Sequence, residues 1–214
     1  MSWSYRYPRD NGVMTELPGT HLPTIEDRLH VGRTVESSSR PFEGKVVNVR
    51  IDEVRLFDGK DAVRRDVVEH PGAAAVIAVN DENEVAFIKQ YRHPVEGELW
   101  EVPAGLLDVE GEDPKETARR ELAEEVDLVA GRLDKLLTLA LSPGGSNEVI
   151  HIYLATDLEA SEETFERNDE EAEFELTWVP IERALDAVTS GKIRNATTVT
   201  ALFAAHYRLS GHEA

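Results

Sequence analysis

The stretch RRELAEEVDL, residues 119–128, places Glu121, Glu124 and Glu125 within little more than one helical turn. On a helix, positions i, i+3 and i+4 are neighbours, so Glu121 faces both other carboxylates, and each like-charge pair costs a few tenths of a kcal/mol. Arg120, four residues before Glu124, offsets part of this repulsion. Two interpretations follow: a solvated acidic face, or a site that holds a divalent cation.

The segment before these glutamates has the composition of a loop that lets backbone and carboxylates approach each other. Ligands that converge on a hard cation need such an approach, which favours glycine, and PAGLLDVEGED supplies Gly105 and Gly111. Glu112 follows, eight residues before Arg120. The sequence therefore offers both a ligand-bearing helix and the loop that would face it.

A helix that carries the glutamates is expected to begin at Pro114. Asp113 is a good N-cap, proline suits the first helical position, and Glu116 completes an Asp-x-x-Glu capping box. An apolar stripe at a spacing of four would face the core. Its members are Ala118, Leu122 and Val126. The glutamates lie on a different face, so they are not needed to build the core.

Composition limits the partners that the protein can have. The chain has 214 residues and a formal net charge of −19, which repels nucleic acid and anionic membranes, so neither is expected as a partner. A phosphorylated small molecule stays compatible if metal ions supply local positive charge. The chain contains no cysteine and no apolar run of membrane-spanning length, which fits a cytoplasmic protein and excludes a thiolate metal site.

Hydrophobic patterning divides the chain into three parts. Residues 1–42 are expected to form a partly disordered N-terminal arm, because residues 1–22 mix proline, glycine and charge without periodicity. Residues 43–72 are predicted to form a hairpin, since KVVNVRIDEVRLF and AVRRDVVEH alternate apolar and polar residues around the turn DGKD. Residues 73–210 combine strand patterns with three helical ones, which indicates an α+β fold with a mixed sheet.

Residues 105–128, GLLDVEGEDPKETARRELAEEVDL, resemble the Nudix box, usually spelled G-x5-E-x7-R-E-U-x-E-E-x-G-U with U aliphatic. Gly105 lies one residue farther from Glu112 than this spelling has, and Asp127 replaces the second glycine. Aspartate tolerates the left-handed conformation that ends a helix, so the second departure is mild. The residues that match in register are Glu112, Arg120, Glu121, Leu122, Glu124, Glu125 and Leu128.

The resemblance extends to the ADP-ribose pyrophosphatases within the Nudix superfamily. QYRHPVEGELWEVPAG, Pro143 in SPGGSNE, and GKIRNATTVTAL are all similar to that subfamily, and the similar segments span most of residues 43–208. This resemblance implies an α+β fold in which helices sandwich a Nudix-type mixed β-sheet, with an N-terminal antiparallel strand hairpin. Residues 73–210 would then be the Nudix hydrolase domain, and residues 43–72 a dimerisation subdomain.

The resemblance also implies a metal site. Glu121 and Glu125 would be the principal ligands of Mg²⁺, with Mn²⁺ as the alternative ion. Glu124 would lie close by, and the Ala104 carbonyl would complete the ligand set. Arg120 would orient the glutamates by a charge-assisted hydrogen bond. Glu112 would support the ligands from behind.

Further residues are implied for the substrate and for the proton transfer. Arg65 and Arg92 would meet the diphosphate or the terminal ribose, and Glu101, Gly144 and Ser146 join the expected substrate-binding set. In this subfamily a glutamate on the loop before the last strand often acts as the general base. RNDEEAEF offers three candidates, Glu170, Glu171 and Glu173, of which spacing from the box favours Glu170.

The expected activity is metal-dependent hydrolysis of ADP-ribose to AMP and ribose 5-phosphate by a homodimer. The alternatives are hydrolysis of another nucleoside diphosphate sugar, a dinucleotide or NADH, and a Nudix module that binds ADP-ribose without cleaving it. The three intact box glutamates and the charge of −19 argue against the sensing module.

Overall fold

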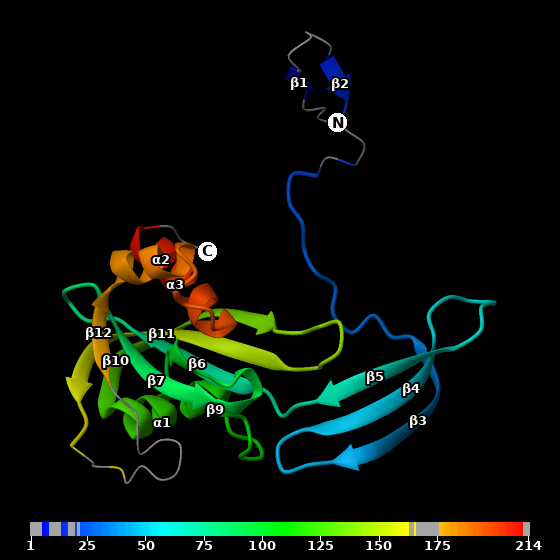
Figure 1. Ribbon diagram of the computed structural model, residues 1–214, viewed down its shortest axis with the longest axis horizontal. Coiled ribbons are helices and arrows are strands. Elements are labelled where there is room, and N and C mark those ends of the chain that lie inside the picture. Colours follow the sequence, from blue (N-terminus) through cyan, green and yellow to red (C-terminus); the bar gives the residue numbers. More distant parts are fainter. Residues whose placement is uncertain are drawn as a thin grey trace.

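The computed structural model describes residues 6–8, 14–16, 20, 22–162, 165 and 176–211. Figure 1 shows a body with helices on both faces of its strands and an N-terminal sheet that projects from one side. The strands outside the body are β1 (Arg6–Pro8), β2 (Met14–Glu16), β3 (Thr34–Glu43), β4 (Asn48–Arg55) and β5 (Val63–Glu69). The body begins with β6 (Ala73–Ala78), and β1 and β2 pair only with each other among the described strands.

Two sheets form the body. The first has the strand order β10-β11-β6-β9, in which β6 runs parallel to β11 and antiparallel to β9, and the second has the order β12-β7-β8. The short helix η1 (His93–Val95) joins β7 to β8. The strands are β7 (Glu84–Arg92), β8 (Gly97–Glu101), β9 (Ala104–Leu106), β10 (Leu128–Ala140), β11 (Val149–Ala160) and β12 (Thr177–Pro180). The mixed α+β fold predicted from the sequence is confirmed.

The central strand β6 supplies two hydrophobic cores at once, because successive side chains of a strand point to opposite faces. Ala75 and Ile77 pack in one core with Leu202 of α3 (Ala196–Leu209), and α2 (Ile181–Thr189) closes that side. Val76 packs in the other core with Leu122 of α1 (Pro114–Val126). Burial of each such aliphatic side chain stabilises the fold by about 1.5–3 kcal/mol. The helices therefore sandwich the sheet, as predicted.

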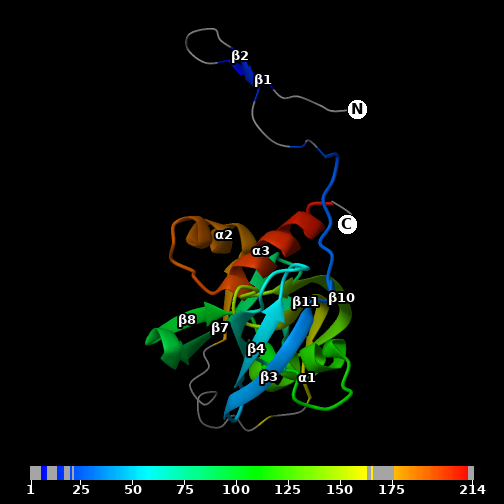
Figure 2. The ribbon, with the colours of Figure 1, turned by 90° about the vertical axis from the view of Figure 1, so that its right-hand side faces the viewer.

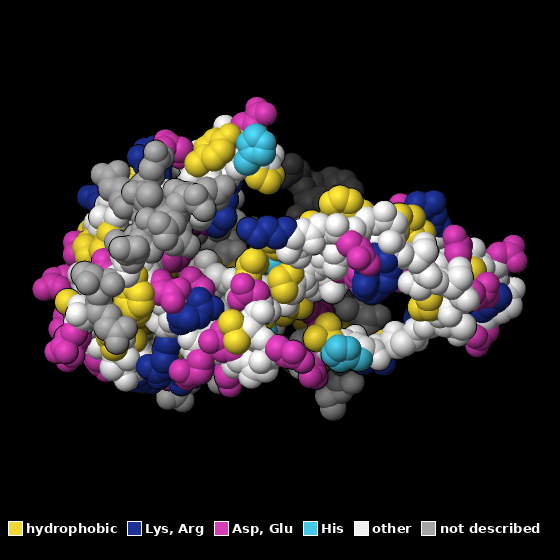
Figure 3. All heavy atoms as spheres, turned by 90° about the horizontal axis from the view of Figure 1, so that it is seen from below, with side chains coloured by type: hydrophobic (Ala, Val, Ile, Leu, Met, Phe, Trp, Pro, Cys, Tyr) yellow, Lys and Arg dark blue, Asp and Glu magenta, His cyan; other side chains and the backbone are white. Residues whose placement is uncertain are grey.

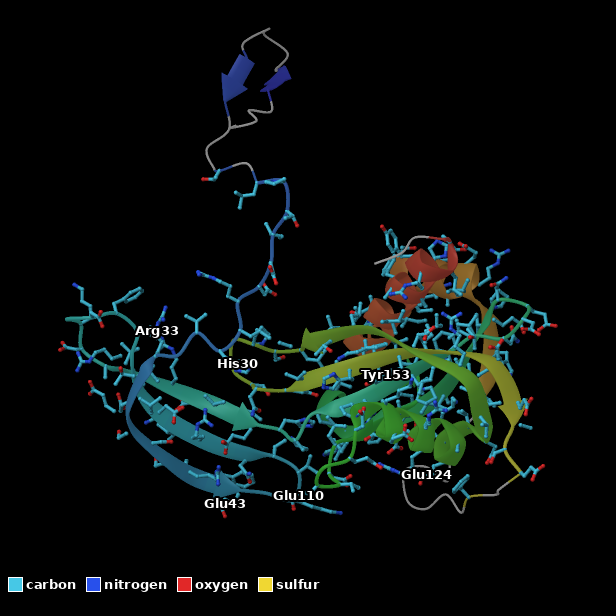
Figure 4. The ribbon with its side chains drawn as sticks, turned by 180° about the vertical axis from the view of Figure 1, so that it is seen from behind. His30, Arg33, Glu43, Glu110, Glu124 and Tyr153 are labelled. Atoms are coloured by element: carbon cyan, nitrogen blue, oxygen red, sulfur yellow. The ribbon has the colours of Figure 1, made fainter. Side chains whose placement is uncertain are left out.

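Helix α1 has the ends that its sequence predicts. The Asp113 side chain accepts a hydrogen bond of 2.8 Å from the Lys115 N–H, and Pro114 occupies the first helical position. Asp127 ends the helix in the left-handed conformation, with φ of 54° and ψ of 39°. The glycine that the box usually has at this position is thus replaced without a change in helix geometry. In Figure 4, Glu124 lies on α1, on the side of the body away from α2 and α3.

The N-terminal sheet differs from the predicted hairpin by one strand. β4 and β5 pair antiparallel as expected, but β3, which pairs with β4, lies almost entirely within the predicted arm of residues 1–42. The local sequence does not indicate β3, because SSSRP is poor in strand-forming residues and Pro41 is tolerated only at an edge strand. Pairing with β4 therefore determines this strand. Within the described ranges, no helix is both long and apolar enough to cross a membrane.

Candidate active site

The acidic face of α1 is turned inward. Glu121 and Glu125 are only 9% and 6% exposed, although they lie off the apolar stripe of the helix. Glu124, between them, is more accessible. A buried carboxylate costs free energy unless a partner compensates its charge. The interpretation of this run as a solvated acidic face is therefore wrong for Glu121 and Glu125.

Strand β9 is the surface against which these carboxylates lie. A Cβ atom built on Gly105 would fall 2.0 Å from Glu121 Oε1, which no real side chain could accept. The Ala104 N–H donates a hydrogen bond of 2.9 Å to Glu125 Oε2. Gly105 is thus the residue that lets the helix carboxylates approach the backbone of the loop, which is the close approach that the sequence predicts.

Arg120 binds three carboxylates at the same place. Its Nη1 lies 2.8 Å from Glu121 Oε1 and 3.1 Å from Glu124 Oε2, and its Nη2 lies 3.5 Å from Glu112 Oε2. Burial lowers the pKa of Arg120, but the charges of Glu121, Glu124 and Glu112 outweigh this effect and raise it. Thr117 holds Glu112 by a 2.7 Å hydrogen bond from its hydroxyl. One guanidinium is therefore shared among three carboxylates.

The donor set suits a hard divalent cation. Carboxylate oxygens are the ligands that Mg²⁺ and Mn²⁺ prefer, and burial strengthens their attraction for a cation. The glycine contact at β9 keeps side chains out of the space beside Glu121. Among the described residues, no three acidic or histidine side chains already converge in ligand geometry, and Arg120 pairs with Glu121 Oε1. Ion binding would thus require these side chains to turn from Arg120 towards the ion.

A cavity of about 670 Å³ lies beside the carboxylates, within the range of small-ligand sites. Ala104 and Gly105, which contact the α1 glutamates, belong to its wall. The other lining residues come from several separate segments between residues 46 and 197: Val46, His70, Ala73, Arg92, Pro94, Glu101, Val102, Leu106, Leu141, Glu148, Ile150, Asn195 and Thr197. The box glutamates are not themselves among these lining residues, so the carboxylate cluster adjoins the cavity through Ala104 and Gly105.

Arg92 and Glu101 are fixed to each other inside this cavity. Arg92 Nε donates to Glu101 Oε1 at 3.0 Å and Nη2 donates to Oε2 at 2.8 Å, a two-point pair across the antiparallel strands β7 and β8. Glu101 is 4% exposed, whereas the Arg92 side chain is partly accessible. A guanidinium held in this way presents its charge in one orientation, which suits an anionic ligand.

Gly144 and Ser146 do not line the cavity. Their loop, between β10 and β11, is bound to the N-terminal sheet, since the Ser146 hydroxyl and the Asn147 N–H both donate to the Val68 carbonyl, at 3.1 and 3.2 Å. The Val68 N–H in turn donates to the Gly145 carbonyl at 2.8 Å. The loop thus joins the N-terminal sheet to the sheet that contains β10 and β11, and it places Glu148 at the cavity wall.

Two predictions remain, one for Arg65 and one for the general base. Arg65 is exposed on β5 and is not among the residues that line the cavity of its own chain; its Nη1 donates to the Arg64 carbonyl at 2.8 Å. The three candidate bases, Glu170, Glu171 and Glu173, lie outside the described residues.

Sequence analysis missed several cavity residues, which lie at the ends of elements. Asn195 caps α3, where its Oδ1 accepts a hydrogen bond of 2.9 Å from the Thr198 N–H, so the N-terminus of that helix borders the cavity. His70 follows β5, and its Nδ1 accepts a hydrogen bond of 3.0 Å from the Gly72 N–H, which leaves the proton of the neutral ring on Nε2. An N-cap pattern was available as a signal for Asn195; only the three-dimensional structure brings Val46 to the wall.

Known proteins share the domain. The NUDIX domain family matches residues 69–201, so the chain belongs to the Nudix family, as its box predicted. The ADP-ribose pyrophosphatase of Bacillus subtilis is 42% identical over 161 residues, which are 75% of this chain and 85% of that protein. The ADP-ribose pyrophosphatase of Mycobacterium tuberculosis is 41% identical over 175 residues, which are 82% of this chain and 84% of that protein.

A solved structure shares the fold. The crystal structure of an ADP compounds hydrolase superposes with a TM-score of 0.69 at 24% identity, covering 84% of this chain and 95% of that one. At this identity the likeness concerns the backbone alone.

Proposed function

We propose that this protein hydrolyses the diphosphate of ADP-ribose to AMP and ribose 5-phosphate with Mg²⁺. The observation that carries this proposal is the position of the buried Nudix-box glutamates against Ala104 and Gly105, on the wall of a cavity that also contains Arg92. The two pyrophosphatases at 41–42% identity support ADP-ribose as the substrate.

Different residues would bind the ion, orient its ligands, bind the diphosphate and accept the proton. Glu121 and Glu125, with Glu124 and the Ala104 carbonyl, would hold the ion, which when bound offsets the carboxylate charge and lowers the pKa of an attacking water. Arg120 would keep the glutamates oriented through the pairs described above. Arg92, fixed by Glu101, would bind the diphosphate. A glutamate among Glu170, Glu171 and Glu173 would accept the proton from water.

A homodimer completes the proposal. Every residue of β3 is exposed in the single chain, including the apolar side chains of Val35 and Phe42 at 51% and 54%. A three-stranded sheet with such an open strand gains stability from a second surface. A second copy would cover β3 and bring Arg65, exposed on β5, towards the partner's cavity. Sedimentation at micromolar concentration should show a dimer, and a monomer would contradict this part of the proposal.

A substrate screen tests the activity. The protein should release product from ADP-ribose with Mg²⁺, measured as phosphate after phosphatase coupling, and EDTA should abolish the release. Faster cleavage of another nucleotide sugar, a dinucleotide or NADH would favour a sister hydrolase. Binding of ADP-ribose without cleavage at any metal concentration would favour the sensing module. A cytoplasmic location, expected from the sequence, stays a prediction that fractionation of cells can test.

A further inference from the structure

A second cavity of about 660 Å³ lies next to the catalytic one and is not used by the proposed reaction. It is formed between β8, with the end of η1, and the connection from α2 to α3. Figure 2 shows the β7–β8 hairpin projecting below that connection. The lining residues are Val95, Gly97, Glu98, Leu99, Trp100, Gly191, Lys192 and Arg194. The two cavities are thus built from neighbouring residues of the same two segments.

Different residues of the shared segments line the two cavities. Glu101 lines the catalytic cavity, where it holds Arg92, and the four residues before it, 97–100, line the second one. In the α2–α3 connection, Lys192 and Arg194 line the second cavity, whereas Asn195 lines the first. A molecule in the second cavity would therefore not compete for the residues that bind the substrate.

Positive charge gathers around Trp100, in a chain whose net charge is −19. Lys89, its antiparallel partner on β7, places Nζ 5.9 Å from the centroid of the Trp100 ring. Lys192 and Arg194 are exposed at the cavity wall, and Arg194 Nε donates to the Gly191 carbonyl at 3.3 Å. Cations at an otherwise acidic surface attract anions locally, and an arginine beside a lysine suits a phosphate.

An apolar recess adjoins this charged cavity. It has a volume of about 340 Å³ and shares Trp100 and Lys192 with the larger cavity. Its remaining lining is Phe87, Thr177, Val179, Ala184, Ala187 and Ile193. A flat aromatic group could enter the recess and contact Trp100, while an attached anionic group stayed between Lys192 and Arg194.

We propose that this pair of cavities is a second, non-catalytic binding site for a nucleoside monophosphate. The base lies in the apolar recess against Trp100, and the phosphate is bound by Lys192 and Arg194. Glu98, the one carboxylate among the residues that line the two cavities, accepts a hydrogen bond from a ribose hydroxyl. The proposal does not depend on the catalytic activity, because none of its residues contacts the α1 carboxylates in the contacts described above.

Calorimetric titration of the full chain with AMP, in EDTA, tests this site. One AMP site should survive Arg92→Ala, which alters the catalytic cavity, and its affinity should fall about tenfold or more in Lys192→Glu/Arg194→Glu. Adenosine and inorganic phosphate should each bind more weakly than AMP, because each supplies only half of the ligand. AMP should also quench tryptophan emission, and Trp100→Phe should remove the quenching while keeping an aromatic ring in the recess.

A matched charge reversal provides the control. Arg33 and Lys60 are exposed cations on the N-terminal side of the chain, and Arg33→Glu/Lys60→Glu changes the net charge by the same amount. This control should bind AMP as the wild type does. The proposal is overturned if the control loses as much affinity for AMP as Lys192→Glu/Arg194→Glu does, or if the only AMP site disappears in Arg92→Ala. It is also overturned if neither the wild type nor any variant binds AMP at millimolar concentration.

Discussion

On the N-terminal sheet two arginines, Arg40 and Arg50, meet the carboxylates of Asp52, Glu69 and, at 3.9 Å, Glu43. On α1, Arg120 meets the carboxylates of Glu112, Glu121 and Glu124. In the first network, Arg40 Nε lies 2.7 Å from Glu69 and Arg50 lies 2.9 Å from Asp52 and 2.8 Å from Glu69. In the second, the described ion pairs join Arg120 to Glu112, Glu121 and Glu124. Figure 3 shows acidic and basic side chains mixed across the α1 side of the body and along the N-terminal sheet.

This difference distinguishes a network that stabilises a sheet from one that is suited to bind an ion. On the N-terminal sheet, two guanidiniums bind Asp52 and Glu69, and these pairs hold the strands together. On α1, one guanidinium meets three carboxylates, and a bound cation would offset part of their negative charge.

Loss of one α1 carboxylate should have the largest effect. Glu121→Gln or Glu125→Gln should lower turnover of ADP-ribose by several powers of ten, because each removes a proposed metal ligand without changing shape. Thermal stability without metal should be equal or slightly higher, since a like-charge pair is lost. Steady-state kinetics at saturating Mg²⁺ checks this, and near-normal turnover would remove both residues from the metal site.

A loop glutamate should affect turnover without affecting binding. Glu170→Gln should lower kcat strongly and leave KM and Mg²⁺ affinity nearly unchanged, because a base acts on the proton in the transition state. Glu171→Gln and Glu173→Gln need the same measurement, since sequence places the base only within this cluster. Full activity in all three variants would move the role to Glu124.

Added Mg²⁺ should stabilise the protein through the α1 network. An ion that binds only the folded state contributes about 2.7 kcal/mol at a concentration one hundred times its Kd. For a chain of this length that corresponds to a rise in Tm of roughly 5–11 °C. Scanning calorimetry of wild type and Glu125→Gln measures it, and an equal rise in both proteins would place the ion elsewhere.

The N-terminal network should respond to acid in a smaller and different way. The Ser38 hydrogen bond and Arg50 hold the pKa of Asp52 below its usual range, and Arg40 and Arg50 do the same for Glu69. A lowered folded pKa contributes stability that is complete above the unfolded pKa, about 4, and is lost as pH falls through the folded value. Arg50→Met should therefore lower Tm by roughly 2–8 °C at pH 7 and by less at pH 3.

Melting curves of Arg50→Met and wild type across that pH range provide the measurement. Arg132→Met is a suitable control, because Arg132 is an exposed arginine that pairs with Asp134 on β10 at the surface. A Tm difference for Arg50→Met that stayed constant down to pH 3 would show that lost packing, and not charge, causes it.

Local sequence was sufficient wherever the determinant of structure lies within a few residues. Helix α1 begins at Pro114 and ends before Asp127 because its caps are encoded beside it. Helix α3 likewise follows a side-chain N-cap, Asn195, whereas α2 follows Pro180, which makes no side-chain cap hydrogen bond. The box glutamates could likewise be placed next to one another on one helix, because positions i, i+3 and i+4 of a helix are neighbours.

Sequence was insufficient where distant segments decide the outcome. Strand β3 depends on its partner β4, and its own residues indicate a loop. The burial of Glu121 depends on Gly105, which the sequence places in the right loop without showing the contact. The hydrogen bond from the Ser146 hydroxyl to the Val68 carbonyl joins residues far apart in the sequence, and no local pattern predicts it.

The bonds between the β10–β11 loop and β5 affect how this chain can be cut or rearranged. The N-terminal sheet projects like a separable module in Figure 1, yet the Val68 backbone exchanges hydrogen bonds with the backbones of Gly145 and Asn147 and accepts one from the Ser146 hydroxyl. Deletion of the sheet would leave those groups of the loop without partners and would open the cavity wall at His70. A circular permutant or an inserted reporter is better placed at the exposed turn around Gly59, which such bonds do not cross.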